Sequence, residues 1–365
     1  MDADCIVIGA GIVGAACARA LARAGLDVLV LDDGRPGATA AGMGHLVAMD
    51  DNPAELALSS ASLAQWRDWM PRLPAACEPR ACGTLWLATD AEEAEEAERK
   101  QARLAAAGVA SRWLDAAALR AAEPALRPDL RGALQVPGDG LVYAPAAAAW
   151  LLGEAGPRLR RERAAAVALD GDAVRLADGG RRRAPHRLLA CGLDAPALCP
   201  DVRLRPKKGH LLITDRYPGT VHHQLVELGY VKSAHHAEGE SVAFNLQPRP
   251  TGQLLVGSSR QFDTTDPAVE PAMLARMLRR ALHYLPALAG LNAIRGWTGL
   301  RAATADGLPL LGAHPRHPGL WLALGHEGLG VTTAPASAAL LAALVTGSAP
   351  PLDPGPYAPA RMIAA

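Results

Sequence analysis

The stretch that decides the fold is Cys5-Ile-Val-Ile-Gly9-Ala-Gly11-Ile-Val-Gly14, whose glycines have the spacing G-x-G-x-x-G. Residues 5–8 form a short apolar run that is typical of a buried parallel strand, and the residues after Gly14 have a helical pattern. In that setting Gly9 permits a tight turn, Gly11 lets a pyrophosphate approach the backbone, and Gly14 lets the helix pack closely on the strand. The stretch therefore predicts a strand–turn–helix unit that binds a dinucleotide at the helix N-terminus.

A second strand that ends in an acid completes this unit. Residues 27–32 read Asp-Val-Leu-Val-Leu-Asp, and Asp32 lies 18 residues after Gly14. At that distance a carboxylate can accept hydrogen bonds from the hydroxyls of an adenosine ribose. Asp33 could share this role, although we expect it to face solvent. The fingerprint alone leaves NAD and FAD open, because both carry the same ADP half.

Length, charge and cysteine usage exclude several classes of protein. The chain has 365 residues, which suits two or three domains, and its 37 basic and 37 acidic residues cancel, which disfavours nucleic-acid binding. No apolar run predicts a transmembrane helix, and Asp2 and Asp4 replace the basic start of a signal peptide. We expect a cytoplasmic protein, which could also lie peripheral to the inner face of the membrane, and we expect its cysteines to be reduced. The spacing of Cys77 and Cys82 predicts no metal site.

Two later glycine-rich segments offer further ligand contacts. Residues 34–45, Gly-Arg-Pro-Gly-Ala-Thr-Ala-Ala-Gly-Met-Gly-His, form a small-residue loop whose backbone a flat ligand can approach. Residues 319–330, Gly-Leu-Trp-Leu-Ala-Leu-Gly-His-Glu-Gly-Leu-Gly, read as a strand and a turn before a helical pattern at 331–345. A second helix N-terminus is thus available to stabilise negative charge.

With these motifs the sequence resembles the D-amino-acid oxidase family of FAD-dependent amine oxidoreductases, which includes glycine oxidase and sarcosine oxidase. The resemblance covers nearly the whole chain and is strongest at residues 5–44, at Arg187-Leu-Leu-Ala-Cys-Gly192, and from Gly296-Trp-Thr-Gly-Leu-Arg301 to Pro335. It implies FAD as the cofactor and an α/β fold, in which a Rossmann-like FAD-binding domain is interleaved with an α+β substrate domain built on an antiparallel sheet. Without the resemblance, an NAD dehydrogenase would also fit the fingerprint.

The resemblance also implies domain limits and FAD contacts. The FAD-binding domain would comprise residues 1–72, 136–204 and 296–365, and the substrate domain residues 73–135 and 205–295. The small-residue loop would contact the flavin and pyrophosphate, the turn before the last long helix would contact the flavin pyrimidine, and Ala164 would contact adenine. The implied FAD-binding residues are Gly9, Gly11, Ile12, Val13, Gly14, Asp32, Asp33, Ala38, Thr39, Ala41, Gly42, Met43, Ala164, Gly192, His326, Glu327, Gly328, Leu329, Gly330, Val331 and Thr332.

On the substrate side, the resemblance implies that Arg301 binds the substrate carboxylate, which suits the fork and the permanent charge of a guanidinium. A surface ion pair is the alternative. Glycine oxidase-like enzymes carry a second arginine where this sequence has Gly328, so a second carboxylate clamp is missing. Glu327 could meet the ammonium or a ring hydroxyl of the substrate, or it could cap the following helix. Tyr230 is a third candidate, with packing in the core as its alternative.

Three phrases point to a subgroup: Gly83-Thr-Leu-Trp-Leu-Ala, Gly257-Ser-Ser-Arg260 and Gly325-His-Glu-Gly-Leu-Gly. They are similar to those of D-hydroxyproline dehydrogenases and of the flavin subunits of opine- and cyanide-forming dehydrogenases. The similarity implies a cyclic secondary amine carboxylate, cis-4-hydroxy-D-proline or D-proline, as the substrate. The implied reaction is hydride transfer from Cα to flavin N5, which gives an imine.

Two alternatives stay open. The chain could be the flavin subunit of a heteromeric dehydrogenase that passes electrons to a partner or a quinone, or it could bind FAD without turning over an amine. Oxygen, a quinone and an electron-transfer protein all remain possible acceptors, and both homo- and hetero-oligomers are compatible with the sequence.

Local patterns predict three further elements outside the fingerprint. A helix is expected over residues 53–70, with Asn52 as its cap and Pro53 in its first turn. The acid-rich residues 91–107 predict a helix with a solvated face. Residues 239–248 and 253–260 predict a hairpin of the substrate domain.

Overall fold

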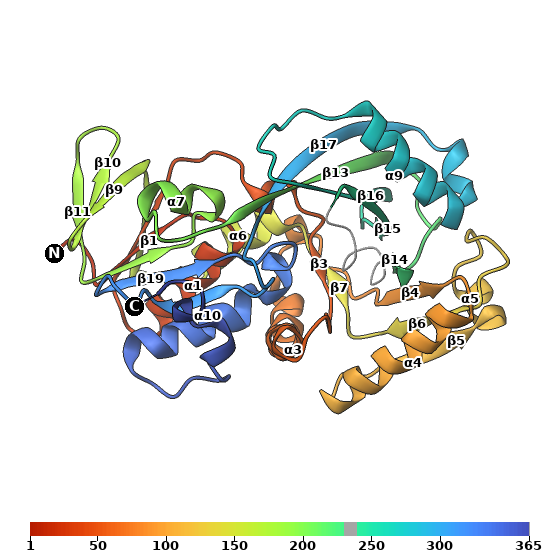
Figure 1. Cartoon of the computed structure of the whole chain (residues 1–365), viewed down its shortest axis with the longest axis horizontal. Coiled ribbons are helices and arrows are strands. Elements are labelled where there is room, and N and C mark those ends of the chain that lie inside the picture. Colours follow the sequence, from red (N-terminus) through yellow and green to blue (C-terminus); the bar gives the residue numbers. More distant parts are fainter. Residues whose placement is uncertain (230–238, 365) are drawn as a thin grey trace.

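The computed structural model describes residues 1–229 and 239–364, which fold around two main sheets (Figure 1). Within these residues the smaller sheet has six strands in the order β18-β19-β12-β1-β2-β8. Its inner pairs are parallel, and only β18 and β19 pair antiparallel. The strands are β1 (Cys5–Ile8), β2 (Val28–Asp32), β8 (Leu159–Arg163), β12 (His186–Leu189), β18 (Leu310–Ala313) and β19 (Leu320–Leu324).

Helices and short elements surround this sheet. α1 packs against both α10 and α6, and α10 packs against α3. The helices are α1 (Ile12–Arg23), α2 (Ala38–Ala41), α3 (Pro53–Trp69), α6 (Ala144–Gly153), α7 (Ala195–Leu198) and α10 (Gly330–Thr346). The short elements on this side are β3 (His45–Leu46), β7 (Gly140–Leu141), β9 (Ala166–Asp170), β10 (Ala173–Leu176), β11 (Arg181–Arg183), η1 (Met70–Arg72), η2 (Ala75–Cys77), η3 (Gly192–Asp194), η5 (Gly355–Tyr357) and η6 (Pro359–Arg361).

The larger sheet has eight strands in the described part of the chain, in the order β17-β13-β16-β15-β14-β4-β6-β5. All of its pairs are antiparallel except β14 with β4. The strands are β4 (Thr84–Ala88), β5 (Arg112–Asp115), β6 (Gly132–Val136), β13 (Arg205–Arg216), β14 (Gln224–Glu227), β15 (Ser241–Pro248), β16 (Gln253–Phe262) and β17 (Ala293–Ala303). Its helices are α4 (Ala91–Ala106), α5 (Ala116–Ala122), α9 (Pro271–Tyr284) and η4 (Pro286–Gly290).

The chain passes between the two sheets several times, as the predicted interleaved α/β fold requires (Figure 1). The predicted domain limits at residues 136 and 205 coincide with the end of β6 and the start of β13. The limit at 296 falls inside β17, so residues 296–303 continue the larger sheet. The division into two domains stays a proposal, with β17 as the strand that runs from the larger sheet toward the smaller one.

The predicted local elements are present, with one correction. The side chain of Asn52 accepts a hydrogen bond from the Glu55 amide at 2.9 Å, which caps α3, and β15 and β16 form the expected hairpin. The acid-rich helix α4 is not solvated along its whole charged face. Glu93 and Lys100 are buried, and Lys100 forms an ion pair with Asp50 while its ammonium lies 3.9 Å from the Trp86 ring. The pattern missed these contacts because their partners lie far away in the sequence.

No helix of the described residues is long and apolar enough to cross a lipid bilayer. The cytoplasmic location stays a prediction.

Asp139, beside β7, gives the fold a pH dependence. Its side chain is 1% exposed, and burial raises its pKa from 3.8 to about 7 although the Ala48 amide donates to it at 3.0 Å. The folded state therefore keeps a proton that the unfolded chain loses near pH 4, and stability falls as the pH rises from about 4 to 7. The stability of the Asp139→Asn variant relative to the natural protein should therefore increase as the pH rises through that interval. Above pH 7 the gain in the free energy of unfolding should reach about 4 kcal/mol. Thermal unfolding at pH 5 and pH 8 tests this, with the exposed Asp68→Asn as the control; an equal difference at both pH values would contradict it.

Candidate active site

The turn between β1 and α1 excludes side chains at two of its glycines. Gly9 has a φ of +107°, and a Cβ there would lie 2.6 Å from the Ala190 carbonyl oxygen. A Cβ on Gly14 would lie 2.0 Å from the Gly9 carbonyl oxygen. The roles predicted for Gly9 and Gly14, a tight turn and close helix packing, are therefore visible in the backbone. They bring the N-terminus of α1 directly over the end of β1, where a ligand meets its free N–H groups.

Asp32 lies next to this turn at the end of β2. Its Oδ2 accepts from the Ala10 amide at 2.7 Å and its Oδ1 from the Gly34 amide at 2.8 Å, which holds the carboxylate beside the glycine turn. The Ala164 amide donates to the Asp32 carbonyl at 3.0 Å, so Ala164 lies beside the acid as well. Asp33 points elsewhere and pairs with Arg35, whose backbone and side-chain hydrogen bonds lower the Asp33 pKa.

The small-residue loop is held between the two sheets. Thr39 on α2 accepts from the Ile12 amide at 3.0 Å through its hydroxyl oxygen, which joins α2 to the first turn of α1. The Ala41 carbonyl accepts from the Trp297 indole at 3.0 Å, and a Cβ on Gly299 would lie 2.6 Å from the Ala41 side chain. The Met43 carbonyl accepts from the Arg249 guanidinium at 3.2 Å. The loop therefore lies between α1 and β17, where the two parts of the molecule meet.

The turn before α10 completes this junction. The Thr332 hydroxyl donates to the His45 carbonyl at 2.9 Å, and a Cβ on Gly330 would lie 3.6 Å from the Val13 side chain. Leu329 is the N-cap of α10 and supplies no side-chain hydrogen bond, so the first N–H groups of the helix are available to a ligand. His326 is buried and its Nε2 lies 3.1 Å from the Ser337 hydroxyl. Burial lowers its pKa to about 4, which leaves it neutral.

The predicted cofactor residues thus gather from several separate segments of the chain. The glycine turn, Asp32 with Ala164, the loop with α2, and the start of α10 are joined by the contacts above. Gly192, with a φ of +56°, begins η3 directly after β12, whose neighbour Ala190 faces Gly9. The side chain of Asp33, another predicted contact, pairs with Arg35.

Arg301 lies on β17 with its side chain half-buried against two glycines. A Cβ on Gly209 would lie 2.5 Å from its Nη2, and a Cβ on Gly328 would lie 3.8 Å from its Cδ. Its Nη2 lies 3.5 Å from the Ser259 carbonyl oxygen. No acidic side chain within residues 1–229 and 239–364 forms an ion pair with it, so the surface ion-pair alternative finds no partner there.

Glu327 faces the same region. It has a left-handed φ of +46°, its amide donates to the Ala302 carbonyl at 3.0 Å, and its carboxylate pairs with the Lys207 ammonium at 2.9 Å. Lys207 lies directly opposite Arg301 in the register of β13 and β17. Burial would raise the pKa of Glu327, but Lys207, Arg301 and Arg260 outweigh burial and lower it. The helix-cap interpretation of Glu327 is wrong, since Leu329 occupies the cap position. Tyr230 lies outside the described residues.

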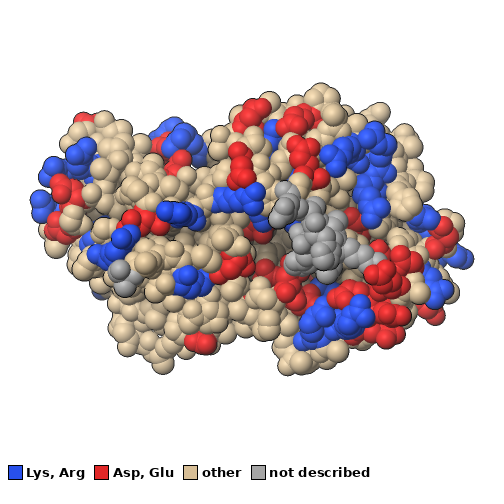
Figure 2. All heavy atoms as spheres, viewed as in Figure 1, with Lys and Arg blue, Asp and Glu red and all other residues tan. Residues whose placement is uncertain are grey.

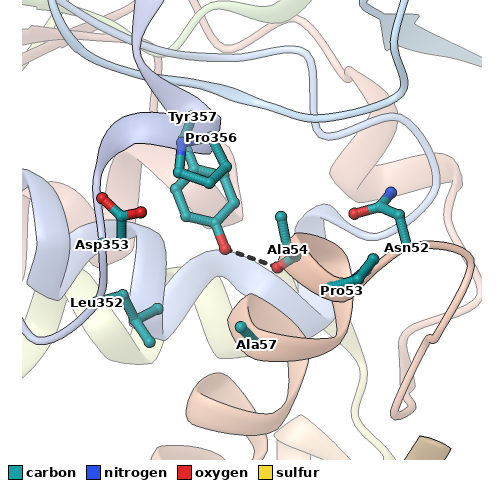
Figure 3. A pocket seen from close by; sticks show the side chains of 8 residues that line it. All are labelled: Asn52, Pro53, Ala54, Ala57, Leu352, Asp353, Pro356 and Tyr357. Carbon is teal, nitrogen blue, oxygen red and sulfur yellow. Dashed lines mark hydrogen bonds between the residues drawn. The ribbon is translucent and has the colours of Figure 1, made fainter.

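The structure also has a pocket that is lined by other residues (Figure 3). It has a volume of about 410 Å³ and is formed by the start of α3 and the C-terminal segment. The Tyr357 hydroxyl donates to the Ala54 carbonyl at 2.6 Å across it. Its lining residues are Asn52, Pro53, Ala54, Ala57, Leu352, Asp353, Pro356 and Tyr357. None of them is a predicted site residue, so it is not the candidate site. The face drawn in Figure 2 carries both positive and negative side chains.

Comparison with known proteins identifies the family. Residues 4–344 match the family described as FAD dependent oxidoreductase. The chain belongs to this family. This FAD-dependent oxidoreductase is 29% identical to glycine oxidase of Geobacillus kaustophilus over 380 residues. The match covers 99% of this chain and 97% of the relative. The oxidoreductase is 27% identical over 421 residues to hydrogen cyanide synthase subunit HcnC of Pseudomonas aeruginosa, with 98% and 96% covered.

Solved structures show the same fold. The crystal structure of the Geobacillus kaustophilus glycine oxidase matches with a TM-score of 0.87 and 27% identity, over 99% of both chains. Iminodiacetate oxidase from Chelativorans matches with a TM-score of 0.84 and 25% identity, over 97% of this chain and 98% of that one. These matches confirm the predicted fold class, and the family match confirms FAD as the cofactor.

The residues of the oxidoreductase fit FAD. A side chain at Gly9 or Gly14 would overlap the neighbouring backbone, so the turn needs both glycines. The start of α10 presents N–H groups that no side chain caps. The buried Nε2 of His45, in the loop that contacts α10, has no hydrogen-bond partner among the described residues. The glycine turn and Asp32 would hold the ADP half, and the loop with the start of α10 would hold the flavin.

The site also contains residues whose role the sequence did not reveal. The sequence alone assigns no role to Lys207 or Gly209, and it includes Ser259 only in the Gly257-Ser-Ser-Arg260 phrase and in the predicted hairpin. Their positions beside Arg301 and Glu327 depend on the register of β13 with β17 and β16. Alternation along each strand could have indicated which residues share a face, but not which residue of another strand lies opposite.

Proposed function

We propose that this oxidoreductase oxidises the C–N bond of a small amine that carries a carboxylate. Cyclic secondary amines, cis-4-hydroxy-D-proline or D-proline, are the substrates that we propose first. The observation that carries the proposal is the presence of two opposite charges at the junction. Arg301 is a half-buried cation with no ion pair among the described residues, and the ionised Glu327 lies close to it. A fixed cation and a fixed anion at one junction complement the two charged ends of an amino acid.

Arg301 is proposed to bind the substrate carboxylate. Its guanidinium is held from one side by Ser259 and has room because Gly209 and Gly328 carry no side chains. A fork of two N–H donors can then bind both carboxylate oxygens. Because Gly328 stands where glycine oxidase-like enzymes carry a second arginine, the second carboxylate clamp is missing at this position, which favours a monocarboxylate.

Glu327 is proposed to bind the other end of the substrate. Its carboxylate is held by Lys207 but keeps acceptor capacity, since a carboxylate has about four lone-pair sites. It can accept a hydrogen bond from the substrate nitrogen or from a ring hydroxyl. The neutral amine of the substrate still has an N–H that can donate to the Glu327 carboxylate.

The reaction needs that neutral form. Oxidation removes a hydride from Cα while the nitrogen lone pair becomes the C=N bond, and water later hydrolyses the imine. FAD supplies the two-electron acceptor when it is bound. The chain's own contribution is to orient Cα–H by holding the carboxylate at Arg301 and the polar end at Glu327.

The names of two relatives support this class of substrate. Glycine oxidase and iminodiacetate oxidase are named for amines that carry carboxylates, and iminodiacetate is a secondary amine. A second candidate function is the flavin subunit of a heteromeric dehydrogenase. The relative HcnC, which is named as a subunit, favours this second function. The second function predicts dye reduction, weak oxidase activity and co-purification with a partner subunit.

The proposal is tested by anaerobic mixing with a panel of D- and L-amino acids that includes the hydroxyprolines, while the visible flavin absorbance is followed. We expect bleaching by the cyclic D-amino acids. Bound FAD that no amine bleaches would leave a flavoprotein without amine turnover, and bleaching by NADH alone would overturn the proposal. Admission of oxygen or of a dye then distinguishes the acceptors by the rate at which the absorbance returns.

Glu327 makes a further prediction. The Glu327→Gln variant should lose about tenfold in kcat/KM for cis-4-hydroxy-D-proline relative to D-proline, because a hydrogen bond to a charged acceptor contributes about 1.5–3 kcal/mol. The measurement is the ratio of kcat/KM for the two substrates. Glu270→Gln is the matched control, since Glu270 pairs with the neighbouring Lys208 at 2.7 Å. An unchanged ratio in Glu327→Gln would remove Glu327 from hydroxyl recognition.

A further inference from the structure

Four side chains with metal-binding chemistry meet at the edge of the smaller sheet, outside the flavin junction. Cys199 and Asp201 follow α7, and His314 and His317 lie in the turn between β18 and β19. One ligand atom from each lies within 4.8 Å of all the others. The first pair is 115 residues from the second in the sequence, so two closely spaced pairs come together only through the fold.

Three of the six separations between these atoms match the edges of a metal-centred tetrahedron, and the other three are at most 4.8 Å. Bonds of about 2.0–2.3 Å from Zn²⁺ to nitrogen, oxygen and sulfur give edges of about 3.3–3.7 Å. Cys199 Sγ lies 3.5 Å from His314 Nε2, His317 Nε2 lies 3.3 Å from Asp201 Oδ2, and His314 Nε2 lies 3.7 Å from Asp201 Oδ2. The last distance is too long for a direct hydrogen bond, whereas a bridging ion would use it.

Burial and hydrogen bonds hold the four side chains in place and leave one side of the cluster open. Cys199 and His314 are buried, and the His317 side chain is 53% exposed, so the cluster has an anchored inner side and an open outer side for entry. The Arg316 guanidinium holds Asp201 Oδ1 at 2.6 Å and leaves Oδ2 facing the histidines. The turn is itself fixed, because the His314 amide donates to the Leu320 carbonyl at 2.8 Å.

We propose that Cys199, Asp201, His314 and His317 bind one divalent transition-metal ion, with Zn²⁺ as the best match. A thiolate, two imidazoles and a carboxylate in a tetrahedron are ligands that Zn²⁺ prefers, and four protein ligands leave no open position for a substrate. The ion is therefore structural. It joins the end of α7 to the β18–β19 turn and closes the edge of the sheet that carries the glycine turn.

Binding changes one hydrogen bond. An ion on Nε2 of His314 requires the ring proton on Nδ1, where the Arg316 amide now donates at 3.2 Å. Metal binding therefore turns that amide away from the ring and releases the thiol proton of Cys199. The loaded protein exchanges one backbone hydrogen bond for four coordinate bonds, and ion binding releases about one proton from the thiol near neutral pH.

The test uses the FAD-loaded enzyme after treatment with a chelator under reducing conditions. Zn²⁺ and Co²⁺ are titrated separately, and bound metal, Co²⁺ absorption and the thermal unfolding midpoint are measured. We expect one ion per chain, a higher midpoint, and the visible bands of tetrahedral Co²⁺ at wavelengths beyond the flavin bands. The exposed variant His317→Ala should bind at least about tenfold more weakly, and Cys199→Ser should lose the thiolate-to-Co²⁺ band.

The controls separate this cluster from other thiols. Cys82→Ser, in the other part of the molecule, should keep both the affinity and the Co²⁺ spectrum. If Cys199→Ser does not fold, His317→Ala still decides the matter, because its side chain is at the surface. Less than stoichiometric metal in the natural protein, or equal affinity in the natural protein and His317→Ala, would overturn the proposal.

Discussion

Replacing Gly14 by alanine is expected to yield a protein that does not retain FAD. The added Cβ would lie 2.0 Å from the Gly9 carbonyl oxygen, and this oxygen belongs to the backbone, which cannot move aside as a flexible side chain could. Relief of that overlap has to lift α1 from the end of β1. Both the glycine turn and the helix N-terminus that would meet the pyrophosphate are then displaced.

The measurement is the ratio of flavin to protein after purification, together with thermal unfolding with and without added FAD. We expect a flavin content near zero and no rise of the unfolding midpoint on addition of FAD. Gly153→Ala is the matched control, because Gly153 ends α6 and, apart from its neighbours in the chain and its own helix backbone, no atom lies within 4 Å of where its Cβ would be. A Gly14→Ala variant with the full flavin content would show that the turn does not carry the FAD.

The glycine turn could be predicted because its constraints are local. A strand of four residues, a turn with φ of +107° at Gly9 and a helix that needs a glycine at its closest contact all lie within residues 5–23. The same holds for Asn52, whose capping bond spans three residues. Where a feature depends on neighbours in the chain, spacing and residue type are sufficient to predict it.

The substrate side could be predicted only in outline. Arg301 follows from a motif, but its room depends on Gly209, which is 92 residues away and reaches it through the β13–β17 pairing. Glu327 was open to a capping interpretation because a glutamate near a helix start often caps it. The left-handed backbone at Glu327 directs its carboxylate to Lys207 instead. Such long-range pairings are set by strand register, which no single segment encodes.

The cluster at Cys199 was missed for a related reason. Rules for metal sites search for cysteine pairs, and Cys77 with Cys82 drew attention because they are close in sequence. The ligand pairs that come together are mixed, Cys199 with Asp201 and His314 with His317, and neither pair alone has a recognised spacing.

Replacing Arg301 by alanine should lower kcat/KM for a carboxylate substrate by roughly a hundredfold, since truncating one partner of a buried hydrogen-bonded charge pair costs about 2–5 kcal/mol. Most of the change should lie in KM, because the lost contact is made in the ground state as well. The guanidinium is half-buried and has no ion pair among the described residues. In Arg301→Ala, water would take its place without restoring the charge.

Steady-state kinetics with the best amine from the panel, and titration of the flavin spectrum with a carboxylate that lacks the amine, measure the effect separately on turnover and on binding. Arg301→Lys should recover part of the affinity through its charge but not the two-point fork. Arg205→Ala on the adjacent strand β13 is the control, because that side chain pairs with Asp263 at the surface and is half exposed. If Arg301→Ala binds the carboxylate probe as tightly as Arg205→Ala does, Arg301 does not bind the substrate, and the charge pair at Lys207 and Glu327 becomes the remaining candidate. Conversely, a loss confined to Arg301→Ala, with the flavin content unchanged, places the carboxylate against β17 and thereby orients the rest of the substrate toward Glu327.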